Sequence, residues 1–153
     1  MSLSTEITIV GFVKLEVVDA RGELVACERV RNTVTNGGLN VMRDLLLGSV
    51  GQYPRAIAGG TDDGTALPLA ATNTALGAEV FRKIILRRDS SDKTAKFQTI
   101  LLTTEGNGST YEEVGLFTST ADDAAILVAR AQHTGIAKTS SNQITYTWEL
   151  QIG

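Results

Sequence analysis

The chain of 153 residues contains one histidine, His133, and one cysteine, Cys27, so few side chains are available for catalysis. Nucleophilic hydrolysis needs a serine or cysteine, a base and a group that orients the base. Only His133 could serve as a histidine base, and the sequence contains no Gly-x-Ser-x-Gly segment that would present a nucleophilic serine. Cys27 lies inside a predicted strand with no nearby cation or helix start to activate its thiol. We therefore expect it to be a small buried side chain.

The carboxylates form no recognisable catalytic or metal-binding pattern either. Glu112 and Glu113 are adjacent, so in a strand they point to opposite faces and cannot form a glycosidase pair by themselves. The run Asp62-Asp63-Gly64 suggests a calcium loop, but the alternating oxygen ligands and the closing glutamate are missing, which favours a solvated turn. We therefore expect no enzymatic activity, no metal, no cofactor and no small-molecule substrate.

Composition is typical of an acidic globular protein. Hydrophobic residues make up 42% of the chain and charged residues 20%, and the net charge is −3. Proteins that bind nucleic acid by neutralising phosphates are usually basic, so this charge argues against a nucleic-acid partner. No apolar run approaches the ~20 residues of a membrane span, and residues 1–6 lack the layout of a signal peptide. We expect a single domain over residues 1–153, with no membrane partner.

Hydrophobic periodicity predicts the elements that would position any site. Residues 6–18 alternate between apolar and other side chains, and a turn at 19–22 leads into a second alternating run, which predicts an amino-terminal hairpin over about residues 6–31. Thr35 or Asn36 can cap a helix over about residues 38–47. Its Leu39, Met42 and Leu46 follow i, i+3, i+7 spacing, and Leu45 and Val41 widen the stripe, so we expect this face to pack on a sheet.

The carboxyl-terminal half predicts a succession of strands separated by turns. Residues 144–152 alternate an aliphatic and aromatic stripe with threonine, glutamate and glutamine, which is typical of a core strand. About eight strands and one helix at roughly regular spacing indicate a mainly β fold: an antiparallel β-sandwich-like domain with the helix packed on a sheet. In this interpretation the helix and sandwich body cover about residues 32–153.

Two segments are candidates for contacts with a partner protein. The loop from Gly59 to Thr74 has no periodicity and few large apolar groups, so we expect it to become ordered only against a neighbour. The strand around Arg82–Arg88 concentrates positive charge in an otherwise acidic chain, which could pair with an acidic surface. The candidate interface residues are Thr61, Asp62, Asp63, Thr65, Leu67, Arg82, Lys83, Arg87 and Arg88.

The order of several short segments resembles a known family. These segments are NTVTNGGL at 32–39, TALGAEVFR at 74–82, EVGLF at 113–117, LVAR at 127–130, KTSS at 138–141 and ITYTW at 144–148. Together they resemble structural proteins of tailed bacteriophages that are related to the amino-terminal domain of tail-collar and tail-fibre proteins. The resemblance implies a domain that is not an enzyme and that attaches a fibre or appendage to the virion.

We therefore expect a virion structural protein, made in the host cytoplasm. It would be a tail, baseplate or fibre-attachment adaptor component that contacts other virion proteins and copies of itself. A capsid decoration, or cement, protein is an alternative within this class. A small β-sandwich module that binds carbohydrate or another ligand is the alternative from another class, although aromatic residues make up only 5% of the chain.

Overall fold

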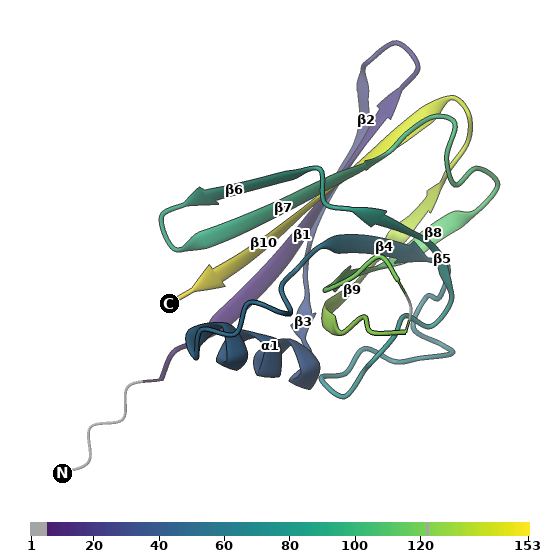
Figure 1. Ribbon diagram of the computed structural model, residues 1–153. Helices are drawn as coiled ribbons and strands as arrows, with labels where there is room; N and C mark the ends of the chain where they lie inside the picture. Colours follow the sequence, from purple (N-terminus) through teal and green to yellow (C-terminus); the bar gives the residue numbers. More distant parts are fainter. Residues whose placement is uncertain (1–5, 122) are drawn as a thin grey trace.

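The computed structural model describes residues 6–121 and 123–153, whose strands form two five-stranded antiparallel sheets (Figure 1). Sheet A has the order β2 (Leu24–Arg31), β1 (Ile9–Asp19), β10 (Asn142–Ile152), β7 (Thr94–Leu101) and β6 (Arg87–Ser91). Sheet B has the order β3 (Thr33–Val34), β9 (Leu127–Ala137), β8 (Thr110–Phe117), β4 (Ala56–Gly60) and β5 (Glu79–Ile84). The predicted class, a mainly β sandwich-like fold with one helix, is confirmed.

The amino-terminal hairpin forms as its alternation predicts. Val13, Leu15 and Val17 on β1 are buried between the sheets, while the residues between them lie on the outer face. In the hairpin turn the Asp19 carboxylate accepts hydrogen bonds from the backbone N–H groups of Arg21 and Glu23. This hairpin extends beyond the rest of the molecule (Figure 1).

Two edge segments pass from one sheet into the other and so hold the sandwich together. Strand β2 continues through Asn32 into β3, and β5 continues through Ile85 and Leu86 into β6. At the second crossing the Ile85 N–H donates to the carbonyl of Arg55 beside β4, and the Leu86 N–H donates to the carbonyl of Gln98 on β7. Each sheet therefore keeps its backbone hydrogen bonds while the chain changes layer.

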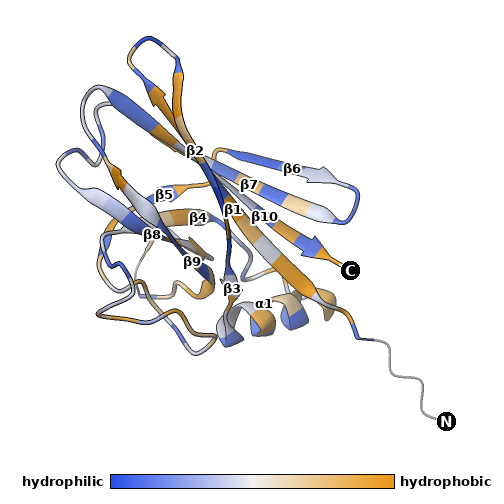
Figure 2. Ribbon diagram, turned by 180° about the vertical axis from the view of Figure 1, so that it is seen from behind, coloured by the Kyte–Doolittle hydropathy of each residue, from blue (hydrophilic) through white to orange (hydrophobic). Residues whose placement is uncertain are grey.

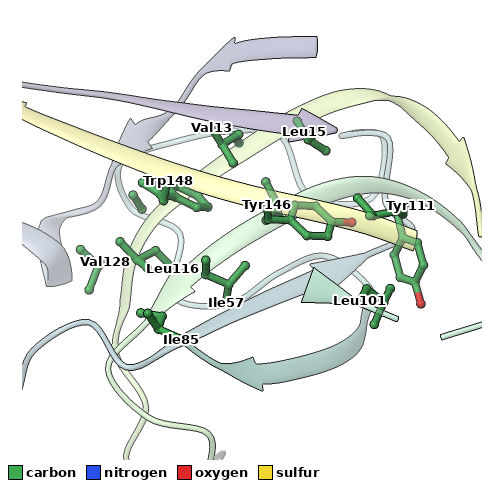
Figure 3. Packing of buried hydrophobic residues seen from close by; sticks show 14 of the residues in the cluster. Val13, Leu15, Ile57, Ile85, Leu101, Tyr111, Leu116, Val128, Tyr146 and Trp148 are labelled. Atoms are coloured by element: carbon green, nitrogen blue, oxygen red, sulfur yellow. The ribbon is translucent and has the colours of Figure 1, made fainter. Parts of the chain in front are cut away.

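The core between the sheets is built around large aromatic side chains (Figure 3). Trp148 and Tyr146 on β10 project from sheet A and are fully buried, and Tyr111 and Leu116 on β8 project from sheet B toward them. Truncating a buried aromatic side chain of this size typically costs about 3–5 kcal/mol. This core fixes the relative position of the two sheets, and with it the ends of the strands that carry the surface groups.

The helix α1 (Asn36–Leu46) forms where it was predicted, but it packs through a different face. Thr35 is its N-cap: the Thr35 hydroxyl accepts a hydrogen bond from the Gly38 N–H and donates to the carbonyl of Leu127 on β9. Gly38 lies against β9 so closely that a Cβ there would be 2.1 Å from the Val128 carbonyl oxygen. This contact sets which side of the helix faces the protein.

The predicted packing face of α1 is therefore wrong at Leu39 and Leu46, whereas Met42 packs against the core and Val41 is buried as expected. Gly38 and Val41 are buried, whereas Leu39 is 49% exposed and Leu46 is 88% exposed. At 3.6 residues per turn, Leu39 and Leu46 lie about 80–100° around the helix from Gly38. The stripe chosen from spacing alone was rotated by that angle away from the buried side.

Candidate functional site: a pinned loop and an uncovered apolar end

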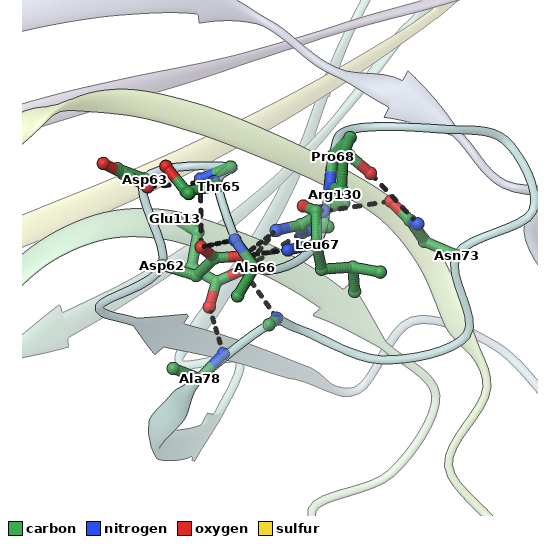
Figure 4. Close-up of polar contacts among 12 residues, drawn as sticks. Asp62, Asp63, Thr65, Ala66, Leu67, Pro68, Asn73, Ala78, Glu113 and Arg130 are labelled. Carbon is green, nitrogen blue, oxygen red and sulfur yellow. Dashed lines mark hydrogen bonds and ion pairs between the residues drawn. The ribbon is translucent and has the colours of Figure 1, made fainter.

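The long loop between β4 and β5, residues 61–78, wraps around the side chain of Arg130 on β9 (Figure 4). The Arg130 side chain is fully buried, so its charge requires partners. Its Nε and Nη2 donate to Glu113 Oε2 at 3.0 and 2.8 Å, and Nη2 also donates to Asp62 Oδ2 at 3.2 Å. Its Nη1 donates to the carbonyl of Leu67 at 2.8 Å and to Asn73 Oδ1 at 3.0 Å.

The two carboxylates in turn hold the backbone of the loop. Glu113 accepts hydrogen bonds from the N–H groups of Gly77 and Ala78, at 3.0 and 2.7 Å. Asp62 accepts hydrogen bonds from three further loop amides, those of Gly64, Ala66 and Leu67. The loop therefore folds around buried, paired charges, and Leu76 near its end adds an apolar contact with the core.

The protonation behaviour of Asp62 follows from these bonds. Burial by itself raises the pKa of the Asp62 carboxyl, but the N–H groups of Ala66, Leu67 and Gly64 and the charge of Arg130 outweigh that effect. The net result holds the pKa of Asp62 below its ordinary value, so the group is ionised at neutral pH. A carboxylate whose oxygens are committed in this way is a structural anchor and not a general acid or base.

The structure corrects two expectations about this loop. Asp62 is buried and is not part of a solvated turn. The expectation that the loop becomes ordered only against a neighbour is also wrong, because Arg130 and Glu113 hold it from within the chain. Of the loop residues predicted at the interface, Thr61 and Leu67 are half-buried, and Asp63 and Thr65 are exposed, with the Thr65 N–H donating to Asp63.

The basic residues predicted at the interface divide into two groups. Arg82 on β5 stacks over the Phe117 ring at 3.9 Å and pairs with Glu79, and Lys83 pairs with Glu105 at 2.6 Å, so both serve contacts within the chain. Arg87 and Arg88 lie on the edge strand β6 and are exposed. Strand β6 lies in sheet A, on the side of the molecule away from the loop, so the nine residues do not form one surface (Figure 1).

The two residues considered for catalysis also have structural positions. Cys27 is exposed and not buried as expected, because its place opposite Glu16 puts it on the outer face of an edge strand. His133 is buried, and burial lowers the pKa of its ring, although the nearby Thr134 carbonyl and the charges of Glu28 and Glu112 oppose that shift. Within the described part of the chain, no group of three or more His, Cys, Asp or Glu side chains could hold a metal ion.

Sequence reasoning missed an exposed apolar surface at the carboxyl-terminal end of α1. We call this surface the apolar end. It consists of Ile7, Leu46, Leu47, Val50 and Ile152, which range from half to almost fully exposed. Figure 2 shows hydrophobic residues at this end of α1 and at the start of β1.

Two hollows lie beside the apolar end, and their linings include Ile7 and Ile152 but not Leu46, Leu47 or Val50. A small cavity of about 150 Å³ lies between α1 and sheet A and is lined by Met42, Leu45, Ile9 and Ile152 among others. A more open hollow of about 590 Å³ shares Ile152 with it and extends to Ile7. One signal was present in the sequence: Leu45, Leu46 and Leu47 are consecutive, and one helix face cannot bury three successive residues.

Comparison with known proteins identifies no relative: no family model, no curated protein and no solved structure matches this chain. Among the residues that the structure describes, no helix has the length and apolarity needed to cross a membrane.

Proposed function

We propose that the chain is a non-enzymatic structural component of a bacteriophage virion, held in the particle by other virion proteins. We place it in the tail, the baseplate or a fibre-attachment position, where it acts as an adaptor present in several copies. The resemblance of its ordered segments to the tail-collar and tail-fibre group suggests this class. The observation that supports it most directly is the apolar end.

The apolar end supports a role in assembly because several large exposed apolar side chains at one end of a molecule are typical of a contact surface. Leu46 is 88% and Leu47 is 79% exposed, although both belong to the ordered end of a helix that is anchored on β9. Burying one such side chain at an interface contributes about 1.5–3 kcal/mol. The buried charged groups of the loop are less available to bind a ligand, because their hydrogen-bonding groups already have partners within the chain.

The experiment is to locate the protein in particles purified from the source host, by antibody labelling and cryo-electron microscopy. We expect it in the tail or at a fibre-attachment position. Phages carrying Leu46→Gln and Leu47→Gln should incorporate less of it, whereas Leu24→Gln, which replaces an exposed leucine beside the turn of the amino-terminal hairpin, should be incorporated normally. A position on the capsid surface would support the decoration role instead. A free protein that is absent from particles and binds a sugar would overturn the proposal.

A further inference from the structure

Strand β9 has an edge that is only partly used. Strand β8 pairs with β9 from Leu127 to Ala137, but on the other side β3 pairs with only two residues, Ala129 and Arg130. Within the described part of the chain, no strand pairs with that second edge from Ala131 to Ala137. An unpaired edge presents backbone N–H and C=O groups to which another strand can add.

A groove runs along this open edge, where β2 diverges from β9. Its volume is about 440 Å³, its floor is formed by Leu15 and Val17, and its walls by Ala26 and Glu28 on β2 and by Thr134–Ile136 on β9. The Glu28 carboxylate accepts hydrogen bonds from the Thr134 N–H at 3.1 Å and from the Thr134 hydroxyl at 3.2 Å. A side-chain oxygen thus occupies a position that the carbonyl of an added strand would take.

The charge of the groove indicates what it attracts. Glu28 lines it, and the carboxylate of Glu112 on β8 lies beside Gly135. No lysine or arginine contributes to the lining of this groove within the described residues. An extended segment with arginine or lysine side chains is therefore the complementary partner.

The same chain carries such a segment in β6. All five residues of β6 are exposed, and the strand forms an outer edge of sheet A, paired only with β7 among the described strands. It begins with Arg87 and Arg88. The Arg87 side chain is 70% exposed and bonded to the neighbouring Asp89, and Arg88 Nη2 donates to the Pro54 carbonyl at 3.0 Å, so pairing across the contact exchanges these bonds. Strand β6 and the open edge of β9 belong to different sheets and lie on different sides of the molecule, so they can meet only between two copies (Figure 1).

We propose that β6 of one copy adds as an extra strand to the open edge of β9 in the next copy, with Arg87 and Arg88 beside Glu28 and Glu112. Each copy carries one donor strand and one acceptor groove, so the contact is heterologous and repeats into a ring or a filament. This inference rests on the proposed function, because it specifies how several copies assemble. It gives β6 the interface role that the sequence suggested. In this contact the Glu28 carboxylate leaves the Thr134 N–H to the added strand and pairs with an arginine instead.

The test uses the full chain with charge reversals on each side of the contact. The association of the parent, Glu28→Lys, Arg87→Glu and the double variant is measured by sedimentation equilibrium at low and high salt. We expect concentration-dependent association of the parent that weakens with salt. Each single reversal should weaken association by at least about tenfold, because it replaces attraction by like-charge repulsion. Arg21→Glu, an exposed reversal at the hairpin turn, is the matched control and should leave association unchanged.

Mixing gives the most specific result. Glu28→Lys retains an intact β6 and Arg87→Glu retains an intact groove, so their mixture should associate in a one-to-one ratio, whereas neither variant associates alone. The double variant Glu28→Lys/Arg87→Glu should associate again, because the swapped charges are complementary. Circular dichroism and thermal unfolding verify that each variant is folded, and Glu112→Lys replaces Glu28→Lys if the latter is not.

Three outcomes would overturn the inference. The first is a parent that stays monomeric up to a concentration on the order of 1 mM. The second is a mixture that does not associate although both variants are folded. The third is a pair of results: the Glu28→Lys protein is no longer incorporated into particles, and the parent does not self-associate. These results together would assign the groove to a basic segment of another protein. Each of these leaves the proposed function standing if the protein is found in particles; absence from particles refutes the function instead.

Discussion

The loop of residues 61–78 and the apolar end of α1 contrast in what holds them. The loop contains few large apolar side chains, yet it is fixed because two carboxylates and one guanidinium satisfy its backbone amides and carbonyls. The apolar end is rich in leucine, yet Leu46 and Leu47 contact little of the protein and remain exposed. Polar groups with complete hydrogen bonding can therefore order most of a segment that has one buried apolar anchor, Leu76, while apolar composition alone does not place a side chain in a core.

The largest effect on stability is expected from a substitution that removes Arg130, the centre of the loop network. Arg130→Met leaves the buried carboxylates of Glu113 and Asp62 without their cation, and breaking a buried ion pair in this way costs about 3–5 kcal/mol. We expect a loss of that size in the free energy of unfolding, measured in urea. Hydrogen exchange should become faster throughout residues 61–78.

The control for this prediction is Arg87→Met on the exposed strand β6. A surface substitution of this kind should change stability by no more than about 0.5 kcal/mol. If the two variants lose similar stability, the buried network does not hold the loop.

The pH dependence of stability tests the same network through Asp62. Because the folded-state pKa of Asp62 lies below its unfolded value, the ionised carboxylate stabilises the fold at neutral pH. This contribution to stability is complete above the ordinary aspartate pKa of about 4 and is lost as the pH falls below that value. Hydrogen bonds to charged groups contribute about 1.5–3 kcal/mol, so Asp62→Asn should be less stable than the parent by that amount at pH 7.

The measurement is urea unfolding of the parent and of Asp62→Asn at several pH values from 7 to 3. The difference between them should narrow below about pH 4, where Asp62 of the unfolded chain begins to take up a proton while the folded-state carboxylate, with its lower pKa, stays ionised. Asp63→Asn is the control: Asp63 is exposed on the same loop, so its substitution should affect stability less at neutral pH. A constant difference between the parent and Asp62→Asn across the whole range would contradict the assigned role.

A third substitution tests how α1 is seated. In Gly38→Ala the added Cβ would lie 2.1 Å from the Val128 carbonyl oxygen, a backbone atom that cannot rotate away. The helix would have to move off β9, and overpacking of this kind costs about 1–3 kcal/mol. Gly51→Ala, which meets no atom within 4 Å, should leave the unfolding midpoint almost unchanged. Equal midpoints for the two variants would show that the helix can shift at no cost.

How far the sequence predicts this molecule depends on whether a feature is set by local spacing or by contacts across the fold. The alternation of β1 and β10 is local, and it predicts their buried faces correctly. The helix is local too, but the orientation of its buried side depends on the approach of Gly38 to β9, which no spacing reveals.

The loop network is a feature that is set by contacts across the fold. Arg130 stands as a lone charge within an otherwise apolar strand segment, and Glu113 directly precedes the apolar residues 114–117; a charge so placed is a signal that it is buried and needs a partner. That they pair with one another depends on the register of β8 against β9, in which Gly115 lies opposite Arg130 and Gln132 opposite Glu113. This register is not visible without the fold, so the sequence alone led to a solvated turn at Asp62.

The smallest effect on stability is expected for a substitution at Leu46. This substitution tests assembly separately from folding. Leu46 is 88% exposed, so Leu46→Gln removes almost no buried surface and should change the free energy of unfolding by no more than about 0.5 kcal/mol. Val41→Gln on the same helix places an amide in a buried site and should cost at least about 1–3 kcal/mol, which provides the contrast. Urea unfolding of both variants measures this difference.

If the apolar end is a contact surface, Leu46→Gln should reduce incorporation into particles despite its unchanged stability. A Leu46→Gln protein that unfolds as easily as Val41→Gln would mean that Leu46 packs against the chain, and the apolar end would then lose its support as a contact surface.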